Sequence, residues 1–466
     1  MSKAIIHPLE KPIETVIELA GSKSITNRTL LIASLAQGKS ELINYSTSKD
    51  SQTIIEFLQK LGADISTTEN RLIIYDINKK LPSTKKIEHN VGPAGTAARF
   101  LTAFGSAFCL NLTLDGSERM RQRPMKPLFK ALEDLGARFK FLNKPYSLPF
   151  QIIKTVDFNK SEVEVLGSIS SQFITALLII SPFFKDFKIK VKDILVSEPY
   201  ADITLSVMKS FGVKVDKETI FDINDLNLQA NCCCSQCNCQ TNLKNELKEI
   251  AKNEITKIFN IKSGKYKAEK YFIEADASSA SYLWSIAAIT KSKIGVKNLP
   301  VHSMQSDSKY ADLLVNIGCK VEKDAQNKVM TVIGTEKLKP ITVDMQTMPD
   351  TAQSLAVTAS FAKGTTTITG LSTLKHKESD RLTAVETELK KMKVSATAGD
   401  DFLIIESKGK PKSAEIETYE DHRMAMAFAI AGARLPMIIK DCHVVEKSFP
   451  EFWQILNSIG IKVELK

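Results

Sequence analysis

The feature that most constrains the fold of this chain is a short pattern that returns six times. In each copy an amphipathic, helix-like segment ends, and an alternating strand follows at once, as in Leu58–Ile65 and Leu132–Phe139. The other copies lie at 208–215, 315–321, 389–394 and 456–463. Glycine suits such a helix end because it adopts a positive φ without a Cβ clash. Lys393 replaces the glycine in the fifth copy, so we expect that helix to be less cleanly capped.

The spacing of these copies predicts an α/β protein with two domains. The capping positions 62, 136, 212, 318, 393 and 460 are separated by 74, 76, 106, 75 and 67 residues, which indicates six repeated α/β units. Six units of about 70 residues are too many for one hydrophobic core, so three units per domain is the natural division. The one long interval contains a polar, cysteine-rich stretch, Asn231–Lys252, which we interpret as an insertion.

The composition is that of a globular protein. Of the 466 residues, 43% are hydrophobic and 25% are charged, which excludes a disordered chain. The most apolar run, Ile174–Phe184, is shorter than the roughly 18–20 residues that cross a bilayer. The N-terminal residues are charged and lack the apolar core of a signal peptide. We therefore expect a cytoplasmic protein that does not contact a membrane.

The charge of the chain is basic, with 63 Lys and Arg against 53 Asp and Glu and a formal net charge of +10. No basic block with interleaved aromatic residues occurs in the sequence, so nucleic acid is not an expected partner. We interpret the excess as a lysine-rich surface. Arginines inside motifs are the candidate binders of small anions.

The eight cysteines do not indicate a disulfide scaffold. Five of them lie between Cys232 and Cys239, without a second pair or a histidine at zinc-site spacing. No metal site is therefore predicted, and adventitious metal or redox chemistry is the alternative for this segment. Cys109, Cys319 and Cys442 lie in apolar segments and are expected to be buried thiols. Exposed thiols persist in a reducing compartment, which again favours the cytoplasm.

Two glycine turns in the first half of the chain precede apolar helices. In Gly21–Arg28 the helix start offers backbone N–H donors, and Lys23 adds positive charge, which suits a phosphate or a carboxylate. An ordinary helix cap is the alternative. In Val91–Arg99, Gly95 permits close approach of a ligand to the backbone, or the segment is a turn with a cap.

Two further segments carry candidate binding groups. Arg119, Arg121 and Arg123 gather three guanidinium groups in five residues, which indicates anion binding or structural ion pairs. The segment Gly167–Phe173 supplies neutral hydroxyl and amide groups. Such groups suit a polyhydroxylated ligand, or they cap the helix that follows.

The last third of the chain has four junctions at which charged residues precede a helix. They are Pro349-Asp350, Lys375–Arg381, Tyr419–Met424 and Glu446–Pro450. The helix N-terminus adds its own partial positive charge to such a junction. Together with the motifs of the first half, these junctions predict a single cleft between two domains.

Taken in order, these motifs resemble those of the 5-enolpyruvylshikimate-3-phosphate (EPSP) synthase family. The shared motifs are Gly-Ser-Lys-Ser-x3-Arg at 21–28, Ala-Gly-Thr at 94–96, Arg-Met-x2-Arg-Pro at 119–124, Ser-Ser-Gln-Phe at 170–173, Asp-Ala-Ser-Ser-Ala-Ser-Tyr at 276–282, Lys-Glu-Ser-Asp-Arg at 377–381 and Asp-His-Arg-Met-Ala at 421–425. The resemblance implies two inside-out α/β barrel domains, each built from three repeated βαβαββ-type units.

The resemblance also implies how the domains divide the site. Residues 21–270 would form the domain with the shikimate-phosphate-binding motifs, including a polar insertion at about 225–262. Residues 1–20 and 271–466 would form the domain with the acid/base and phosphoenolpyruvate-binding motifs.

The reaction implied by the resemblance transfers the carboxyvinyl group of phosphoenolpyruvate to the 5-hydroxyl of shikimate 3-phosphate and releases phosphate. It is a step of the shikimate pathway to chorismate and the aromatic amino acids, and it passes through a tetrahedral intermediate. No cofactor and no metal are implied. The expected partners are the two small-molecule substrates, and we expect a monomer.

The resemblance assigns roles to matching positions. The implied catalytic residues are Lys23, Asp350 and Glu378; Glu378 would protonate the methylene carbon, and Asp350 would take the hydroxyl proton. The residues implied to hold phosphoenolpyruvate are Lys23, Gly95, Arg123, Gln172, Arg381, Arg423 and Lys447. Those implied to hold shikimate 3-phosphate are Ser24, Arg28, Ser170, Ser171, Gln172, Ser197, Tyr200, Asp350 and Lys377. The supporting residues are Asp50, Asp421 and His422.

Three positions refine this expectation. Pro93 and Thr373 stand where the family often has asparagine, so we expect each to lack an asparagine contact to the ligands. Gly95 is retained, so we expect inhibition by glyphosate, a mimic of phosphoenolpyruvate.

Two alternatives to this function fit the sequence less well. UDP-N-acetylglucosamine enolpyruvyl transferases have a Lys-Asn pair near the N-terminus and a cysteine on a mobile loop. Here Lys23 is followed by Ser24, and the loop at Arg119–Arg123 contains no cysteine. A binding protein without catalysis, for example one for nucleic acid, would leave the coexistence of Lys23, Asp350, Glu378 and Arg381 unexplained.

Overall fold

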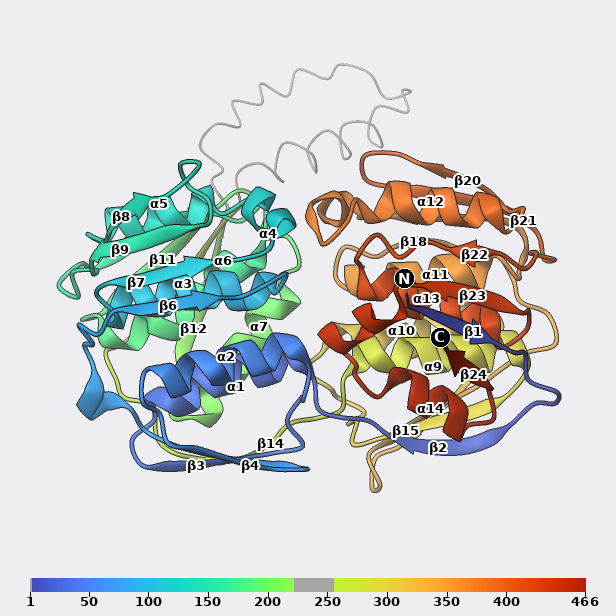
Figure 1. The fold of residues 1–466 in the computed structure, drawn as a ribbon, viewed down its shortest axis with the longest axis horizontal. Coiled ribbons are helices and arrows are strands. Elements are labelled where there is room, and N and C mark those ends of the chain that lie inside the picture. Colours follow the sequence, from blue (N-terminus) through green and yellow to red (C-terminus); the bar gives the residue numbers. More distant parts are fainter. Residues whose placement is uncertain (1, 222–254) are drawn as a thin grey trace, which may run out of the picture.

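The computed structural model describes residues 2–221 and 255–466. In this part of the chain, six four-stranded sheets form two groups around central helices (Figure 1). In every sheet one pair of neighbouring strands is parallel and the other pairs are antiparallel. Along the chain, the strands of each sheet alternate with helices in the same order, so the predicted six βαβαββ-type units are confirmed.

Three units build the half that is coloured blue to green in Figure 1. The first contains α1 (Lys23–Leu35), β3 (Lys39–Ile43), α2 (Lys49–Lys60), β4 (Ile65–Thr68), β5 (Arg71–Tyr75) and β14 (Lys270–Phe272). The second contains β6 (Ile87–Asn90), α3 (Gly95–Phe108), β7 (Leu112–Asp115), α4 (Glu118–Gln122), α5 (Lys126–Asp134), β8 (Arg138–Phe141) and β9 (Phe150–Lys154). The third contains β10 (Glu162–Leu166), α6 (Ser171–Ile180), β11 (Phe187–Lys192), α7 (Pro199–Ser210), β12 (Val215–Phe221) and β13 (Ile255–Ile261).

Three further units build the other half, and the two N-terminal strands belong to it. The fourth unit contains β2 (Glu14–Glu18), α9 (Ala277–Thr290), β15 (Lys293–Lys297), α10 (Tyr310–Asn316), β16 (Lys320–Asp324) and β17 (Val329–Ile333). The fifth contains β18 (Thr342–Asp344), α11 (Ala352–Ala359), β19 (Lys363–Thr369), α12 (Arg381–Lys391), β20 (Ser395–Ala398) and β21 (Leu403–Lys408). The sixth contains β22 (Glu415–Ile416), α13 (His422–Gly432), β23 (Met437–Lys440), α14 (Phe452–Ser458), β24 (Val463–Leu465) and β1 (Lys3–Ile6).

The first helix of each unit lies in the interior, and the sheets lie outside. Every residue of α13 is buried, and so is every residue of α3 except Thr96. A helix that is apolar on all sides must be covered on all sides, and neighbouring helices together with the sheets supply this cover, as where α3 packs on α6 and α11 on α13. The six sheets are separate in the described residues, so each half is a ring of sheets around helices rather than one continuous hydrogen-bonded barrel.

Two hydrophobic cores fill the two halves. One core is formed by buried residues from Ile25 to Ile273, and the other by residues 4–19 together with residues from Ala275 to Val463. The chain passes from the second core to the first between Leu19 and Ile25, and it returns to the second core between Ile273 and Ala275. We keep the division into domains at about residues 20 and 270 as a proposal, which these two cores support.

The predicted insertion at about 225–262 is too long at its C-terminal end. Residues 255–261 form β13, which pairs antiparallel with both β11 and β12 and so occupies the interior of its sheet. Ordered strand pairing of this kind belongs to the third repeated unit. The cysteine-rich segment and the rest of the predicted insertion lie outside the described residues.

All six predicted helix ends have a positive φ, including the end at Lys393. The five glycines have φ values between 84° and 107°, and Lys393 has a φ of 61°. The Lys393 amide donates to the Lys390 carbonyl at 3.0 Å and the Val394 amide to Leu389 at 3.1 Å, as in the glycine copies. The expectation that this helix is less cleanly capped is therefore wrong, since its capping hydrogen bonds are the same as in the glycine copies. Lysine adopts the same left-handed conformation, at a steric cost.

Three further expectations can be compared with the described residues. Cys109, Cys319 and Cys442 are buried free thiols, as predicted. No described helix is both long enough and apolar enough to span a membrane. No group of three or more metal-ligating side chains occurs in residues 2–221 and 255–466.

Candidate active site

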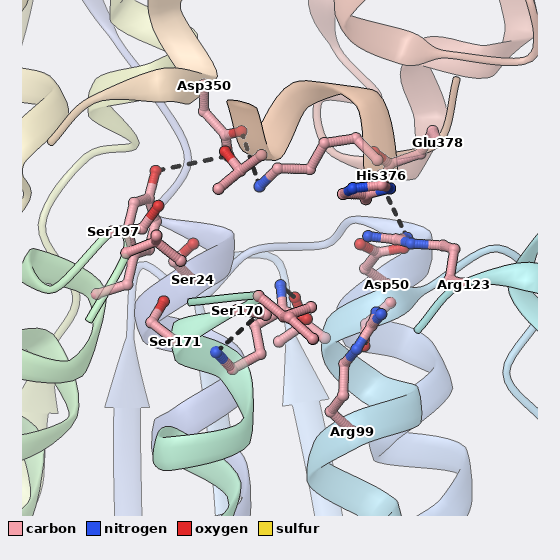
Figure 2. A pocket seen from close by; sticks show the side chains of 18 of the residues that line it. Ser24, Asp50, Arg99, Arg123, Ser170, Ser171, Ser197, Asp350, His376 and Glu378 are labelled. Carbon is pink, nitrogen blue, oxygen red and sulfur yellow. Dashed lines mark hydrogen bonds and ion pairs between the residues drawn. The ribbon is translucent and has the colours of Figure 1, made fainter. Parts of the chain in front are cut away.

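A pocket lies where the two halves meet, and it is lined by residues from both (Figure 2). Helices α1, α3 and α6 begin at this pocket in the first half, and α12 and α13 begin there in the second half. Each helix N-terminus brings unpaired backbone N–H groups and partial positive charge. The repeat architecture thus directs several positive helix ends at one space, which favours anionic ligands.

The structure brings most of the predicted site residues to the wall of this pocket. They are Lys23, Ser24, Arg28, Asp50, Gly95, Arg123, Ser170, Ser171, Gln172, Ser197, Tyr200, Asp350, Lys377, Glu378, Arg381, His422 and Arg423. Lys447 and Asp421 lie behind the wall and contact residues that line it. The single cleft predicted between the two halves is therefore present.

Glu378 is surrounded by cations from both halves of the molecule. Arg381 Nη2 lies 2.8 Å from Glu378 Oε2, Arg123 Nη1 lies 3.5 Å from Oε1, and Lys447 also pairs with Oε1. Burial alone would raise the pKa of Glu378, but these three cations together hold that pKa well below its usual range. In the absence of bound anions Glu378 is thus a carboxylate.

Asp350 is held in the same way by a second set of cations. Arg423 Nη2 lies 2.7 Å from Asp350 Oδ2, and Arg381 Nη1 and Lys377 Nζ lie 3.1 and 3.7 Å from Oδ1. Burial raises the pKa of Asp350, but Arg423, Lys377 and Arg381 outweigh burial and keep the pKa well below its usual range. Asp350 is therefore an ionised carboxylate that can accept a proton.

Arg381 links the two acids, and Asp421 fixes it from behind. Arg381 Nε donates to Asp421 Oδ2 at 2.8 Å, and the side chain of Arg381 is only 2% exposed. Asp421 also accepts the backbone N–H of Arg423 at 2.9 Å, at the start of α13. A planar guanidinium group held at three carboxylates has one fixed orientation, so Arg381 sets the distance between Asp350 and Glu378.

Lys23 and Asp50 form a third ion pair at the pocket, with Nζ and Oδ2 3.0 Å apart. Lys447 Nζ lies 3.7 Å from the same Asp50 oxygen. His422 lies nearby in the wall, and burial together with Lys447 and Lys23 lowers its pKa well below the usual value. The His422 ring is therefore neutral in this structure.

Hydroxyl and amide groups line the opposite side, as the segment Gly167–Phe173 predicts. Ser170 caps α6, and Gln172 Nε2 donates to Thr96 Oγ1 at 3.4 Å. Arg28 is already occupied by the protein: its guanidinium donates to Ser24 O at 2.6 Å, to Tyr200 O at 2.8 Å and to Thr204 Oγ1 at 2.8 Å. Most of the donors of Arg28 therefore organise the pocket wall, and burial lowers its pKa to about 9.

The three clustered arginines have three different environments, so the cluster as a whole does not bind an anion. Arg121 pairs with Asp115 at 2.6 Å on the exposed surface. Arg119 donates to backbone carbonyls of the other half. Only Arg123 lines the pocket. Charge spacing in the sequence could not separate these environments.

Gly95 is packed against two of the pocket arginines. A Cβ atom at this position would lie 2.4 Å from Arg123 Nη1 and 2.5 Å from Arg99 Nη1. Any side chain here would therefore displace a guanidinium group. Arg99 is a site residue that the sequence reasoning missed, although it ends the glycine motif Val91–Arg99 that was singled out.

Other lining residues also went unpredicted. Thr96, Pro124, Ile169, Val196 and His376 complete the wall. Thr373 lines the pocket, and its buried Oγ1 has no hydrogen-bond partner in the structure, whereas Pro93 is exposed and is not part of the wall.

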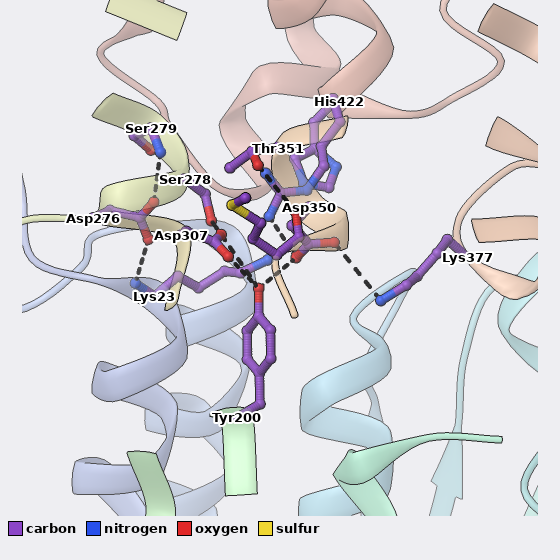
Figure 3. A network of polar contacts seen from close by, with 12 residues as sticks. Lys23, Tyr200, Asp276, Ser278, Ser279, Asp307, Asp350, Thr351, Lys377 and His422 are labelled. Atoms are coloured by element: carbon purple, nitrogen blue, oxygen red, sulfur yellow. Dashed lines mark hydrogen bonds and ion pairs between the residues drawn. The ribbon is translucent and has the colours of Figure 1, made fainter. Parts of the chain in front are cut away.

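A polar network beside Asp350 contains a further acid that sequence reasoning missed (Figure 3). Tyr200 Oη lies 3.2 Å and 3.3 Å from the two Asp307 carboxylate oxygens and 3.5 Å from Asp350 Oδ2. Ser278 Oγ also donates to Asp307. Burial and the charge of Asp350 raise the pKa of Asp307 to about 7. No motif in the sequence marked Asp307, because a lone acid before a helix is common.

Comparison with known proteins decides the family. The sequence profile of the family described as EPSP synthase (3-phosphoshikimate 1-carboxyvinyltransferase) matches residues 9–226 and 243–456. The chain belongs to the EPSP synthase family. The unmatched residues 227–242 contain the five clustered cysteines. The resemblance drawn from the motifs is thus confirmed, and the UDP-N-acetylglucosamine transferase alternative is not favoured.

Individual relatives of this family are similar to the chain over nearly its full length. A chloroplastic 3-phosphoshikimate 1-carboxyvinyltransferase from Brassica napus is 35% identical over 98% of this chain and 85% of that protein. The 3-phosphoshikimate 1-carboxyvinyltransferase of Vibrio campbellii is 34% identical over 99% of this chain and 100% of that protein.

Solved structures show the same fold. The EPSP synthase of Acinetobacter baumannii superposes with a TM-score of 0.77 at 23% identity and covers 100% of both chains. The enolpyruvyl transferase NikO from Streptomyces tendae superposes with a TM-score of 0.70 at 11% identity, covering 100% of this chain and 99% of that one. The predicted fold class is therefore confirmed.

Proposed function

We propose that this protein transfers the carboxyvinyl group of phosphoenolpyruvate to the 5-hydroxyl of shikimate 3-phosphate and releases phosphate. The observation that carries the proposal is the arrangement of two ionised acids, Asp350 and Glu378, on one shared arginine, Arg381, inside a pocket lined with cations from both halves. Family membership supports the same reaction.

The charge of the pocket fits a pair of anionic substrates. Phosphoenolpyruvate and shikimate 3-phosphate bring two phosphates and two carboxylates, which repel one another in water. Fixed lysine and arginine side chains offset this repulsion and hold both molecules at reacting distance. The hydroxyl groups opposite, at Ser24, Ser170, Ser171 and Ser197, suit the uncharged hydroxyls of the shikimate ring.

We assign the donor phosphoenolpyruvate to the side of the pocket near Glu378. The residues proposed to hold it are Lys23, Gly95, Arg123, Gln172, Arg381, Arg423 and Lys447. The residues proposed to hold shikimate 3-phosphate are Ser24, Arg28, Ser170, Ser171, Gln172, Ser197, Tyr200, Asp350 and Lys377. Asp50, Asp421 and His422 support these groups through Lys23, Arg381 and the pocket wall.

In the addition step, Asp350 takes the proton of the 5-hydroxyl group of shikimate 3-phosphate. The oxygen of that hydroxyl group forms a bond to C2 of phosphoenolpyruvate. The double-bond electrons take a proton from Glu378 to give a methyl group, and a tetrahedral ketal phosphate results. In the elimination step, the methyl group returns a proton to Glu378 as the C–O bond to phosphate breaks. The departing phosphate takes the proton held by Asp350, assisted by Lys23.

Glu378 must be protonated to act as the acid, although its pKa is low in this structure. The cations that lower the pKa of Glu378 are the same ones proposed to hold phosphoenolpyruvate. When the phosphate and carboxylate of the substrate neutralise Lys447, Arg123 and Arg381, burial becomes the dominant influence and raises the pKa. Substrate binding thus prepares the acid. Each positioned proton transfer contributes about 10²–10⁴ to the rate.

The experiment that tests this function measures phosphate release from phosphoenolpyruvate with two acceptors. We expect release with shikimate 3-phosphate and none with UDP-N-acetylglucosamine. Release with UDP-N-acetylglucosamine alone would replace the proposed acceptor, and release with neither would overturn the proposal. The expected cytoplasmic location and monomeric state stay predictions from the sequence.

A further inference from the structure

Arg119 crosses the cleft without entering the pocket. It lies on α4 of the first half, and its guanidinium group contacts the backbone of a loop in the second half. Arg119 Nε donates to Glu378 O at 3.0 Å, and Nη2 lies 3.1 Å from Lys377 O and 3.5 Å from Lys375 O. The contacts reach three carbonyl oxygens within four residues, all in the loop that carries the acid.

We propose that Arg119 is a positioning residue that holds the loop at 375–378 across the cleft, so that Lys377 and Glu378 face the bound substrates. This inference rests on the proposed function, because it concerns the residues assigned there as acid and as ligand of shikimate 3-phosphate. Arg119 is not among the residues that line the pocket, so its action on the reaction passes through the backbone of the loop.

The loop at 375–378 contains the end of one helical segment and leads to the start of the next. The 3-10 helix ends at His376, and α12 begins at Arg381 with Asp380 as its N-cap. Carbonyl groups at a helix end carry partial negative charge, and a guanidinium group satisfies several of them at once. The side chains of this stretch are paired within their own half, Lys375 with Asp400, Lys377 with Asp350 and Glu378 with Arg381. Arg119 from the opposite half adds the contacts to its backbone carbonyls.

Arg119 also ties the acid to the arginine proposed to hold the donor. Arg123 follows α4 directly, and its N–H donates to the Met120 carbonyl at 3.2 Å. Met120 is buried, which anchors the short helix in the first half. Because Arg119 and Arg123 belong to one rigid turn, the contact of Arg119 with the loop sets how Glu378 faces Arg123.

Arg121 provides a matched control on the same helix. Its guanidinium group pairs with Asp115 of its own half, and its side chain is 41% exposed. Arg121 has the same charge and lies two residues from Arg119, but no contact across the cleft is found for it in the described residues. Removal of Arg121 thus reports the effect of losing one arginine from α4 without losing the contact to the loop.

The test compares Arg119→Ala, Arg119→Lys and Arg121→Ala by two measurements. Amide hydrogen exchange of the ligand-free protein reports on the loop at 375–378 without any substrate. Steady-state phosphate release reports on catalysis. We expect Arg119→Ala to speed exchange at 375–378 and to lower kcat by about 10- to 100-fold, since small displacements of a reacting group are costly.

Arg119→Lys should give intermediate exchange and an intermediate kcat, because a lysine satisfies fewer carbonyls and lacks the fixed fork of arginine. Arg121→Ala should leave both measurements within about twofold of wild type, as expected for an exposed ion pair. The Kd of Arg119→Ala for shikimate 3-phosphate alone should rise by a smaller factor than the factor by which its kcat falls.

Loop exchange and kcat in Arg119→Ala equal to those in Arg121→Ala would overturn the proposal. If Arg119→Ala does not fold, Arg119→Lys decides, and unchanged exchange at 375–378 in that variant would also overturn it. The exchange measurement needs no substrate, so it still tests the role of Arg119 if wild type fails to use shikimate 3-phosphate. Failure of the proposed function and failure of this inference are therefore distinguishable.

Discussion

At the scale of single residues, each acid of the pocket forms ion pairs with lysine or arginine side chains that are also proposed to bind the anionic substrates. Arg381 lies between Asp350 and Glu378 and contacts both. Buried charges of this kind are costly unless they are paired. The pairing compensates the cost of burying these charges, and bound anions would take Arg123, Arg381 and Lys447 from Glu378 as partners.

Substitution Glu378→Gln tests the acid role. The amide keeps the size of the carboxyl group but cannot donate its proton in the same way, so we expect kcat to fall by about 10²–10⁴-fold. Binding of the substrates should not weaken, because removal of the negative charge leaves Arg123, Arg381 and Lys447 unopposed. Calorimetric titration and phosphate release give the two values. Glu386→Gln, on the outer part of α12, is the control, and a normal kcat for Glu378→Gln would remove it from the catalytic set.

Gly95→Ala tests the donor side of the pocket. Because the new Cβ would lie 2.4 Å from Arg123 Nη1, that guanidinium group must move. We expect KM for phosphoenolpyruvate to rise roughly tenfold, which corresponds to about 1.4 kcal/mol of binding, with no change in the affinity for shikimate 3-phosphate.

The intact Gly95 also predicts glyphosate inhibition of the wild-type enzyme in competition with phosphoenolpyruvate. Inhibition kinetics at several concentrations of phosphoenolpyruvate measure this. Inhibition that does not vary with phosphoenolpyruvate would count against the assigned donor position.

Asp307 gives a prediction about pH. Burial and the neighbouring Asp350 raise the pKa of Asp307 to about 7, above its ordinary value of 3.8. Because the folded state holds this proton more tightly than the unfolded state, the contribution of Asp307 to stability falls as pH rises from about 4 through 7. Arg423 and Asp276 also act on Asp307, in opposite directions.

Asp307→Asn removes this ionisation while keeping the shape of the side chain. We expect the difference in Tm, variant minus wild type, to be more positive at pH 8 than at pH 5. Thermal denaturation of both proteins at both pH values measures this difference. Asp312→Asn, at an exposed aspartate of α10, should show no such trend. A Tm difference that is the same at both pH values would mean that Asp307 is already ionised in the folded protein.

At the scale of elements, the sequence predicted the helix ends well because their cause is local. A left-handed residue after an amphipathic helix leaves a pattern within eight residues, and all six copies adopt it. The partners of Arg119 and Arg28 could not be predicted, because they come from residues far away along the chain. The sequence shows that a charge is present but not which group it contacts.

Lys393→Gly tests the cost of the one non-glycine helix end. Lys393 has a φ of 61°, where a Cβ clashes with the following carbonyl. We expect glycine to stabilise the protein by about 0.5–1 kcal/mol, less than the full relief because glycine adds entropy to the unfolded chain. Urea denaturation measures this. Lys390→Gly, inside α12, should instead destabilise by about 1 kcal/mol, and equal effects of both variants would contradict the argument.

At the scale of the whole molecule, the repeats predicted six units, and the family resemblance implied that residues 1–20 join the second domain, but neither predicted which strands pair. The N-terminal strands β1 and β2 complete sheets of the second half, and β14 completes the first sheet. The chain therefore crosses between halves near Gly21 and again near Ala275, where the two residues form an isolated bridge. These pairings join residues hundreds of positions apart, and no local pattern encodes them.

The same crossing explains why the site needs both halves. Lys23 and Arg123 come from one half, and Asp350 and Glu378 come from the other. The motifs were visible in the sequence as separate helix starts. Their convergence follows from the packing of repeated units, which brings the starts of α1, α3, α6, α12 and α13 to one pocket.

The most direct test of this account is a crystal structure with shikimate 3-phosphate and phosphoenolpyruvate bound to Glu378→Gln. The account predicts both molecules in one pocket, the residue-378 side chain about 3–3.5 Å from the methylene carbon, and Asp350 at the 5-hydroxyl. Substrates bound on separate surfaces, or a methylene carbon facing away from residue 378, would contradict it.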